Sequence, residues 1–261
     1  MPPSSRQLLV FTDLDGCLLD HYSYSYHPAG PALDELKRSQ VPLILTSSKT
    51  LAELAELSVE LELSSPFIFE HGAGVVIPDG YFSTVISGLI SHESWWLKSF
   101  GPNLSEILTA VHKIRDENGF RFSGFSDMTS SEVAVLTGLS LPRAAMAKQR
   151  LFTEPVMWQD SEYNWRIFSE LLNESGLCHL RGGRFIHITG GGDKGIALDW
   201  LRKCYSKETG IKPMVMALGD SENDIGMLQM ADYPIVLRSP VHEPPLVTEK
   251  ADVVLTEKTG P

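Results

Sequence analysis

Residues 8–20, which read LLVFTDLDGCLLD, decide the fold because they join an apolar segment directly to a pair of carboxylates. The apolar run from Leu8 to Phe11 predicts a short strand that is buried on both faces, as in a parallel sheet. Asp13 and Asp15 follow at the end of this strand. Side chains two positions apart in an extended chain point to the same side, so the spacing predicts that both carboxylates face one cleft.

The two carboxylates have two interpretations. Neighbouring anions repel each other, so the pair is costly unless a cation lies between them or one carboxyl group is protonated. Mg²⁺ is the natural cation, because it binds oxygen ligands, usually one or two carboxylates together with waters and a substrate phosphate. Alternatively, Asp13-Leu14-Asp15-Gly16 is only a polar turn, since Asp and Gly are common turn residues. The rest of the chain decides between the two.

Composition and charge exclude several classes of protein. A chain of 261 residues suits one large domain or two modest ones. The formal net charge of -11 argues against nucleic acid as a partner, because its phosphates require a basic surface. Three cysteines without metal-ligand spacing fit a reducing cytoplasm. No apolar run is long enough for a membrane span or a signal peptide, so we expect a cytoplasmic protein without membrane contact.

A second apolar segment, 41–45, ends in the polar run Thr46-Ser47-Ser48-Lys49-Thr50. A short helix predicted over 31–40 precedes it, and this strand–helix–strand spacing indicates a βαβ unit of a parallel sheet. Thr50 and Glu53 have the spacing of a capping box before the next helix. Hydroxyls and backbone N–H groups at a helix N-terminus suit a phosphate, although the same residues serve equally as plain helix caps.

A third predicted strand, 66–69, leads into the turn Glu70-His71-Gly72-Ala73-Gly74. His71 has no histidine or cysteine companion there, so a structural role is favoured over metal binding. The two glycines are expected to serve the backbone geometry of the turn.

The regular alternation of strand and helix stops in the middle of the chain. From residue 81 to 188 the pattern predicts an α+β mixture. The helices are expected near 104–118, 139–150 and 161–176, and the strands near 120–122, 155–158, 177–180 and 184–188. The βα pattern then resumes with a helix that begins at Lys194 and a strand over 214–218. We therefore predict a separate unit inserted into a parallel core.

Four motifs occur in order: D-L-D-G at 13–16, a serine after the second strand, a lysine that opens a helix, and G-D-x-x-N-D at 219–224. Together they resemble the motifs of the haloacid dehalogenase superfamily of phosphotransferases. The resemblance implies an α/β fold, with a Rossmann-like parallel-sheet core over 1–80 and 189–261 and an inserted α+β cap domain over 81–188. All four motifs then fall at carboxyl ends of parallel strands, where ligands bind in open α/β sheets.

The resemblance also implies the chemistry, which is hydrolysis of a phosphomonoester through an aspartyl-phosphate. Asp13 is the implied nucleophile, and Asp15 is the implied general acid and base. Ser47, with Thr46 as the fallback, and Lys194 are implied to hold the phosphoryl oxygens.

Mg²⁺ is the implied cofactor, held by Asp13, the backbone carbonyl of Asp15, and Asp220. Asp224 is assigned to the same metal site, where it and Asn223 would orient metal-bound water or neighbouring ligands. The alternative for this second acidic segment is an ordinary helix N-terminus enriched in acidic residues.

Segments in the middle of the chain narrow the resemblance to the mannosyl-3-phosphoglycerate phosphatase family; they are 125–129, 136–140, 147–155 and 182–187. The implied partner is a small phosphorylated sugar, and the implied protein is a monomer or weak homodimer. Arg184 offers a planar fork suited to the glycerate carboxylate, and Glu154 can accept sugar hydroxyls. The implied substrate-binding residues are Ser48, Lys49, Glu154, Arg184, His187, Ser221 and Asn223.

The identity of the sugar does not follow from the sequence, because mannosyl- and glucosyl-3-phosphoglycerate differ in the configuration of one hydroxyl. A related phosphatase acting on sucrose 6-phosphate is a second interpretation. A phosphosugar-binding module without turnover is a third, and the intact set of Asp13, Asp15, Ser47, Lys194 and Asp220 argues against it. A mutase would transfer the phosphate to a second sugar rather than release it.

Overall fold

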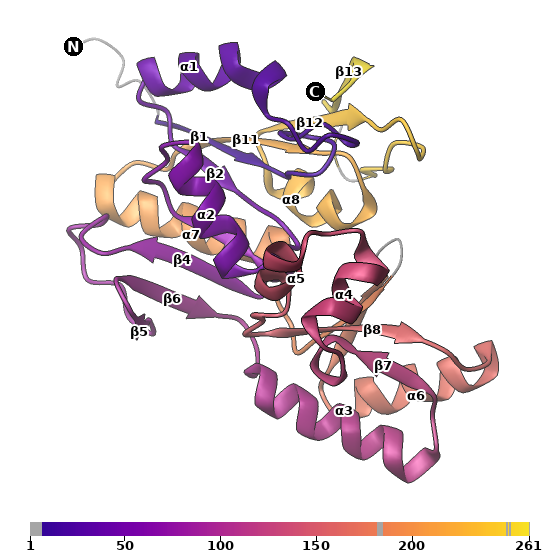
Figure 1. The fold of residues 1–261 in the computed structure, drawn as a ribbon. Helices are drawn as coiled ribbons and strands as arrows, with labels where there is room; N and C mark the ends of the chain where they lie inside the picture. The colour runs from indigo at the N-terminus through magenta and orange to yellow at the C-terminus, as the bar shows by residue number, and fades with distance from the viewer. Residues whose placement is uncertain (1–6, 182–184, 249, 251, 261) are drawn as a thin grey trace. The chain divides into compact units, whose positions relative to one another are not determined.

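A five-stranded sheet in the order β13-β12-β11-β1-β2 positions the motifs (Figure 1). The computed structural model describes residues 7–181, 185–248, 250 and 252–260. The strands of this sheet are β1 (Leu8–Thr12), β2 (Leu43–Leu45), β11 (Met214–Gly219), β12 (Tyr233–Arg238) and β13 (Val254–Thr259). Every neighbouring pair is parallel, which confirms the predicted α/β fold with a parallel-sheet core.

The register of the central strands brings two motifs to the same edge of this sheet. Thr12 at the end of β1 pairs with Leu218 of β11, and the backbone N–H of Asp13 donates to the carbonyl of Leu218 over 2.9 Å. Asp13 directly follows β1 and Asp220 directly follows β11, so both residues lie at the same edge of the sheet.

A second sheet, in the order β3-β4-β6-β5, differs from the sequence-based prediction. Its strands are β3 (Phe67–Phe69), β4 (Gly74–Pro78), β5 (Ile90–His92) and β6 (Trp95–Ser99). The third predicted strand was expected in the parallel core, but β3 pairs antiparallel with β4 because the turn between them reverses the chain. A parallel bridge between Thr46 and Ile68 links its edge to the end of β2. The β5–β6 hairpin was not predicted.

The chain divides into two compact units. The first comprises the described residues up to Ser48, Leu61–Lys98 and those from Asp193 onward, and the second comprises Lys49–Glu60 and Ser99–Gly192. Residues 81–98, which the sequence-based bounds place in the cap, belong here to the first unit, because β5 and β6 extend the sheet of β3 and β4. The helices of the first unit are α1 (Gly30–Arg38), α7 (Lys194–Thr209) and α8 (Ile225–Met230).

The second unit contains the four-stranded antiparallel sheet β7-β8-β10-β9. Its strands are β7 (Phe122–Gly124), β8 (Thr153–Trp158), β9 (Cys178–Arg181) and β10 (Ile186–Thr189). Its helices are α2 (Leu51–Glu60), α3 (Leu104–Asn118), α4 (Ser130–Thr137), α5 (Leu141–Ala147) and α6 (Glu162–Glu174). Apolar residues of α3 and α6 pack with β7 and β8 around Phe168 and Val156, both fully buried. Among the described residues, no helix has the length and apolar character needed to cross a membrane.

Candidate active site

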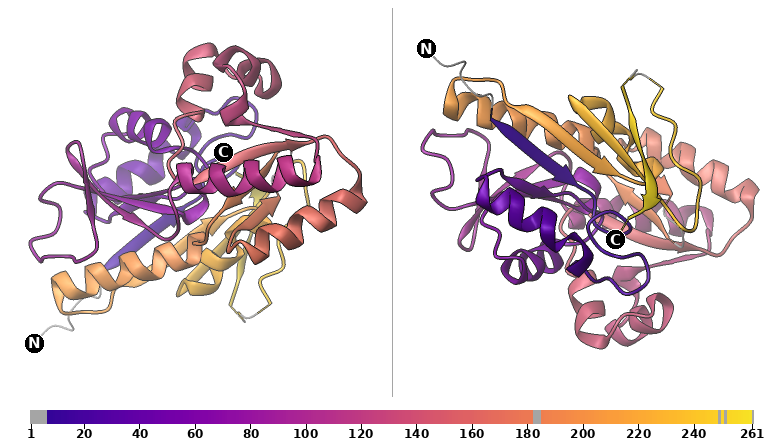
Figure 2. Two further views of the ribbon diagram at one scale, coloured as in Figure 1. Left: turned by 90° about the horizontal axis from the view of Figure 1, so that it is seen from below. Right: turned by 90° about the horizontal axis from the view of Figure 1, so that it is seen from above.

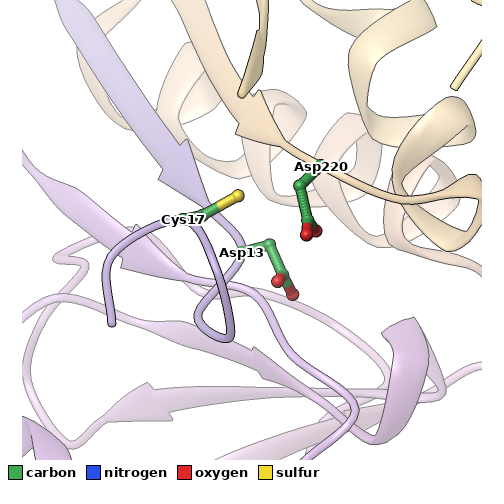
Figure 3. Close-up of side chains that lie close together, drawn as sticks. All are labelled: Asp13, Cys17 and Asp220. Carbon is green, nitrogen blue, oxygen red and sulfur yellow. The ribbon is translucent and has the colours of Figure 1, made fainter. Parts of the chain in front are cut away.

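Asp13 and Asp220 form the centre of the site. They directly follow β1 and β11, and their carboxylates lie close together and point to the same side (Figure 3). The potential ligand atoms of Asp13, Cys17 and Asp220 all lie within 4.8 Å of one another, and all three residues are buried. The structure therefore brings together two of the residues predicted to bind a metal ion.

Cys17 is a member of this cluster that the sequence patterns did not single out. Burial raises the pKa of its thiol well above the usual value, and the carboxylates of Asp13, Asp224 and Asp220 raise it further. Sulfur is a soft donor, so Cys17 is a poor ligand for a hard cation such as Mg²⁺. The two carboxylates are the oxygen donors of this cluster.

The loop after β1 depends on Gly16, which has a φ of +85°. A Cβ at this position would lie 2.8 Å from Oδ2 of Asp220, so only glycine combines this backbone conformation with this close approach. The Asp15 carboxylate in the same loop is near enough to raise the pKa of Asp13. It does not belong to the cluster of Asp13, Cys17 and Asp220, which leaves the predicted metal contact of Asp15 to its backbone carbonyl.

Lys194 is the first residue of α7, and its ammonium group is buried between carboxylates. Its Nζ donates to Oδ1 of Asp13 over 2.6 Å, to Oδ1 of Asp224 over 2.6 Å and to Oδ1 of Asn223 over 3.2 Å. Burial by itself lowers the pKa of Lys194, but Asp13 and Asp224 outweigh burial and raise it above the usual value. Lys194 is therefore a fixed positive charge beside Asp13.

Two opposing effects act on the pKa of Asp13. Burial raises the pKa of its carboxyl group to about 7, while the ammonium of Lys194 acts in the opposite direction. Burial also raises the pKa of Asp220, and the nearby Asp224 adds to that effect. Such a site favours a cation near its carboxylates.

Asp224 lies at the end of the 3₁₀ helix Glu222–Asp224 and is fully buried. Its Oδ2 accepts from the backbone N–H groups of Asp220 over 3.0 Å and Ser221 over 3.1 Å, and its Oδ1 accepts from Lys194. These contacts fix the loop after β11 and orient Lys194. Ser221 donates to Asn223 over 3.2 Å, so both predicted substrate-binding residues of this loop also take part in its internal bonding. Direct contact of these residues with a metal ion or substrate stays a prediction.

Ser47 follows β2 and is almost completely buried. Its backbone N–H donates to the carbonyl of Ile68 over 3.0 Å, and its carbonyl accepts from the N–H of His71 over 3.0 Å. Thr46, the fallback, donates its hydroxyl to the carbonyl of Ile44 over 3.3 Å. Ser48 and Lys49, which come next, are partly buried.

Comparison with known proteins identifies the family. Residues 178–259 match the family model of haloacid dehalogenase-like hydrolases. Glucosyl-3-phosphoglycerate/mannosyl-3-phosphoglycerate phosphatases from Methanococcoides burtonii and Persephonella marina are both 38% identical to this chain. The first aligns over 89% of this chain and 85% of its own length, and the second over 88% and 84%. The chain belongs to this phosphatase family.

Solved structures show that the family's fold is that of the haloacid dehalogenase superfamily. A phosphatase of this superfamily from Bacteroides thetaiotaomicron superimposes with a TM-score of 0.64 at 18% identity, covering 99% of this chain and 92% of that one. A haloacid dehalogenase-like hydrolase from B. subtilis gives a TM-score of 0.61 at 15% identity, with 95% and 94% covered. At these identities the likeness concerns the fold alone.

Three residues on or near the sheet of the second unit were predicted to bind the substrate of this phosphatase. Glu154 on β8 is buried, and its Oε1 accepts from the N–H of Ser126 over 2.8 Å and from its hydroxyl over 2.7 Å. Burial raises the pKa of Glu154. Burial and the nearby Arg150 lower the pKa of His187 on β10 to about 3, so its imidazole is neutral. The third, Arg184, lies outside the described residues.

Two further contacts of the phosphatase site have no signal in the sequence. His242 approaches Asp220, with Nε2 3.4 Å from Oδ2. The end of β13 lies beside the loop that follows β1 (Figure 2), and a Cβ on Gly260, the residue after β13, would come within 2.0 Å of the carbonyl oxygen of Gly16. Both residues are remote from the motifs along the chain, so local patterns did not find them.

Proposed function

We propose that this phosphatase hydrolyses the phosphomonoester of mannosyl-3-phosphoglycerate and of its glucosyl counterpart, releasing phosphate and the hexosylglycerate. The names of its 38% identical relatives support both substrates. The observation that carries the chemistry is the buried group in which Lys194 contacts Asp13 beside Asp220.

In the proposed reaction the Asp13 carboxylate attacks phosphorus, so a bond forms between its oxygen and phosphorus while the bond to the glycerate oxygen breaks. Asp15 donates a proton to that leaving oxygen, which departs as the hydroxyl of the product. Asp15 then takes a proton from a water molecule, which attacks phosphorus and releases inorganic phosphate from Asp13. Lys194 and Ser47 hold the phosphoryl oxygens in both steps.

The donor set fits Mg²⁺. Asp13 and Asp220 supply buried carboxylate oxygens within 4.8 Å of each other, and hard oxygen donors are the ligands that Mg²⁺ prefers. The Asp15 backbone carbonyl would complete the protein ligands, with Asp224 supporting the site. When bound, the ion would neutralise charge shared by the nucleophile and the phosphate.

We assign recognition of the rest of the substrate to the polar residues that the sequence predicted for this role. Arg184 would bind the glycerate carboxylate, and Glu154 and His187 would bind sugar hydroxyls. The remaining proposed contacts are Ser48, Lys49, Ser221 and Asn223. A neutral imidazole at His187 can both donate and accept a hydrogen bond, which suits a hydroxyl.

The test is phosphate release, with Mg²⁺ and after its removal by a chelator, from the mannosyl and glucosyl substrates, sucrose 6-phosphate and an aryl phosphate. We expect a Mg²⁺-dependent preference for the hexosylphosphoglycerates of about a hundredfold in kcat/KM, about 2.7 kcal/mol of discrimination between transition states. Equal, weak rates on all four compounds would leave a phosphatase but reject the named substrates. Full activity without a divalent ion would reject the metal assignment.

The nucleophile is tested separately. Asp13→Asn keeps an oxygen that can accept from Lys194 but removes the nucleophilic charge, so we expect loss of turnover with the fold retained. Phosphate release and the unfolding midpoint of the same preparation measure both. Turnover like that of the wild type would contradict the assignment.

A further inference from the structure

The turn between β3 and β4 has an unusual backbone. Glu70, His71 and Gly72, the 3₁₀ helix η2, have consecutive φ values of +49°, +61° and +93°. Glu70 and His71 are both buried. Left-handed conformations are unfavourable for residues other than glycine, and they persist where the surrounding structure enforces them.

One side of this turn fixes Ser47. The N–H of His71 donates to the carbonyl of Ser47 over 3.0 Å. The N–H of Ser47 donates in turn to the carbonyl of Ile68, on the strand that enters the turn. Both backbone polar groups of Ser47 are therefore bonded to the segment from Ile68 to His71, and its position follows that of the turn.

The other side of the turn fixes the start of α7. A Cβ on Gly72 would lie 2.2 Å from the carbonyl carbon of Asp193 and 2.5 Å from the backbone nitrogen of Lys194. Asp193 is the N-cap of α7, and its side chain accepts from the N–H of Ile196 over 2.8 Å. The helix therefore begins in direct backbone contact with Gly72, and a displaced turn would displace Lys194.

We propose that Glu70–Gly72 is a positioning turn that sets the distance between Ser47 and Lys194. These are the two residues assigned above to the phosphoryl oxygens, so the inference rests on the proposed function. The strained backbone brings the His71 N–H to Ser47 and places a residue without a side chain against Lys194. The turn contacts neither phosphate nor metal in this proposal, and it acts through the two residues that it holds.

The test compares Gly72→Ala with Gly210→Ala. Both substitutions place alanine at a positive φ, +93° and +71°, but a Cβ on Gly210, the C-cap of α7, meets nothing within 4 Å. We expect kcat of Gly72→Ala to fall on the order of a hundredfold, as misplacement by about 1 Å does, while Gly210→Ala keeps the wild-type kcat. The loss should be the same for the aryl phosphate as for the sugar substrates, because the turn acts on the phosphoryl end.

A second pair keeps the inference testable if Gly72→Ala does not fold. His71→Gly and His71→Ala both remove the imidazole, but only alanine opposes the left-handed backbone. We expect the glycine variant to have several-fold higher kcat per folded molecule, with folded protein quantified by circular dichroism. Equal kcat values within this pair, or within the Gly72 and Gly210 pair, would overturn the inference while leaving the phosphatase intact. A wild-type protein that released no phosphate would instead contradict the proposed function itself.

Discussion

Among single residues, Lys194 is expected to have a large effect on stability, because its charge compensates two buried carboxylates. Lys194→Met has a side chain of similar length but leaves Asp13 and Asp224 without their buried cation. We expect it to lower the free energy of unfolding by about 3–5 kcal/mol and to abolish phosphate release. Denaturant unfolding measures the first effect.

The matched control is Lys203→Met on the same helix. Lys203 pairs with Asp199 over 2.6 Å, but 75% of its side chain is exposed. Exposed ion pairs contribute little, so we expect a change below about 1 kcal/mol. Similar losses for both variants would contradict the structural role assigned to Lys194.

His187 gives a pH dependence of stability with a definite sign. Burial and Arg150 lower its pKa to about 3 in the folded chain, against the usual value of 6.5 for histidine. Between these values the unfolded chain binds a proton that the folded chain does not, so the stability present above pH 6.5 is lost as the pH falls. From pH 7 to pH 5 the expected loss is about 2 kcal/mol. Chemical unfolding of wild type and His187→Gln checks this, and the variant should depend less steeply on pH.

At the scale of single residues, the predictions from the sequence depended on the order of the motifs along the chain. Asp13, Lys194 and Asp220 were found because each follows or opens an element in the expected sequence, and the structure brings them together. Cys17 and His242 were missed, since their proximity to these residues arises from folding rather than from local spacing.

Among the elements, α7 holds the segment that leads into the β5–β6 hairpin. Oε1 of Glu208 accepts from the N–H of Ser83 over 3.0 Å and Oε2 accepts from the N–H of Thr84 over 2.9 Å. The hydroxyl of Ser83, which donates to Oε1 over 2.6 Å, and these two N–H groups lower the pKa of Glu208 to about 2. We expect Glu208→Gln to speed amide hydrogen exchange at residues 83 and 84, because a charged acceptor is replaced by a neutral one. Unchanged exchange there would show that these bonds do not order the segment; Asp199→Asn on the same helix is the control.

The parallel strands β1, β2 and β11 were predictable because each is an apolar run followed by a polar motif, whereas β3 was assigned to the wrong sheet. Its three apolar residues fit a core strand equally well, and the tight turn at Glu70–Gly72 decides its pairing. The β5–β6 hairpin was missed because β5 is short and mostly exposed, so it lacks the periodicity that marks a strand.

At the scale of the whole molecule, the sequence predicted two units, but it did not predict that Lys49–Glu60 belongs to the second one. Helix α2 follows a strand of the first unit but belongs to the second, where the hydroxyl of Thr50 donates to the carbonyl of Met146 over 3.0 Å. Apolar periodicity indicates that one face of a helix is buried, but it does not indicate which element that face packs against. The roles predicted for the two units, catalysis and substrate recognition, stay predictions.

The proposed metal binding would couple the site to the stability of the whole fold. The carboxylates of Asp13 and Asp220 approach each other only in the folded protein, so an ion bound there stabilises it against unfolding. At Mg²⁺ concentrations about 100 times the dissociation constant, we expect about 2.7 kcal/mol of stabilisation, seen in calorimetry as a higher unfolding temperature. General screening of the net charge of -11 would also raise stability, so Asp220→Asn in the same buffer is the control. An equal rise in the variant would assign the effect to screening and reject this metal site, whatever the enzyme's activity.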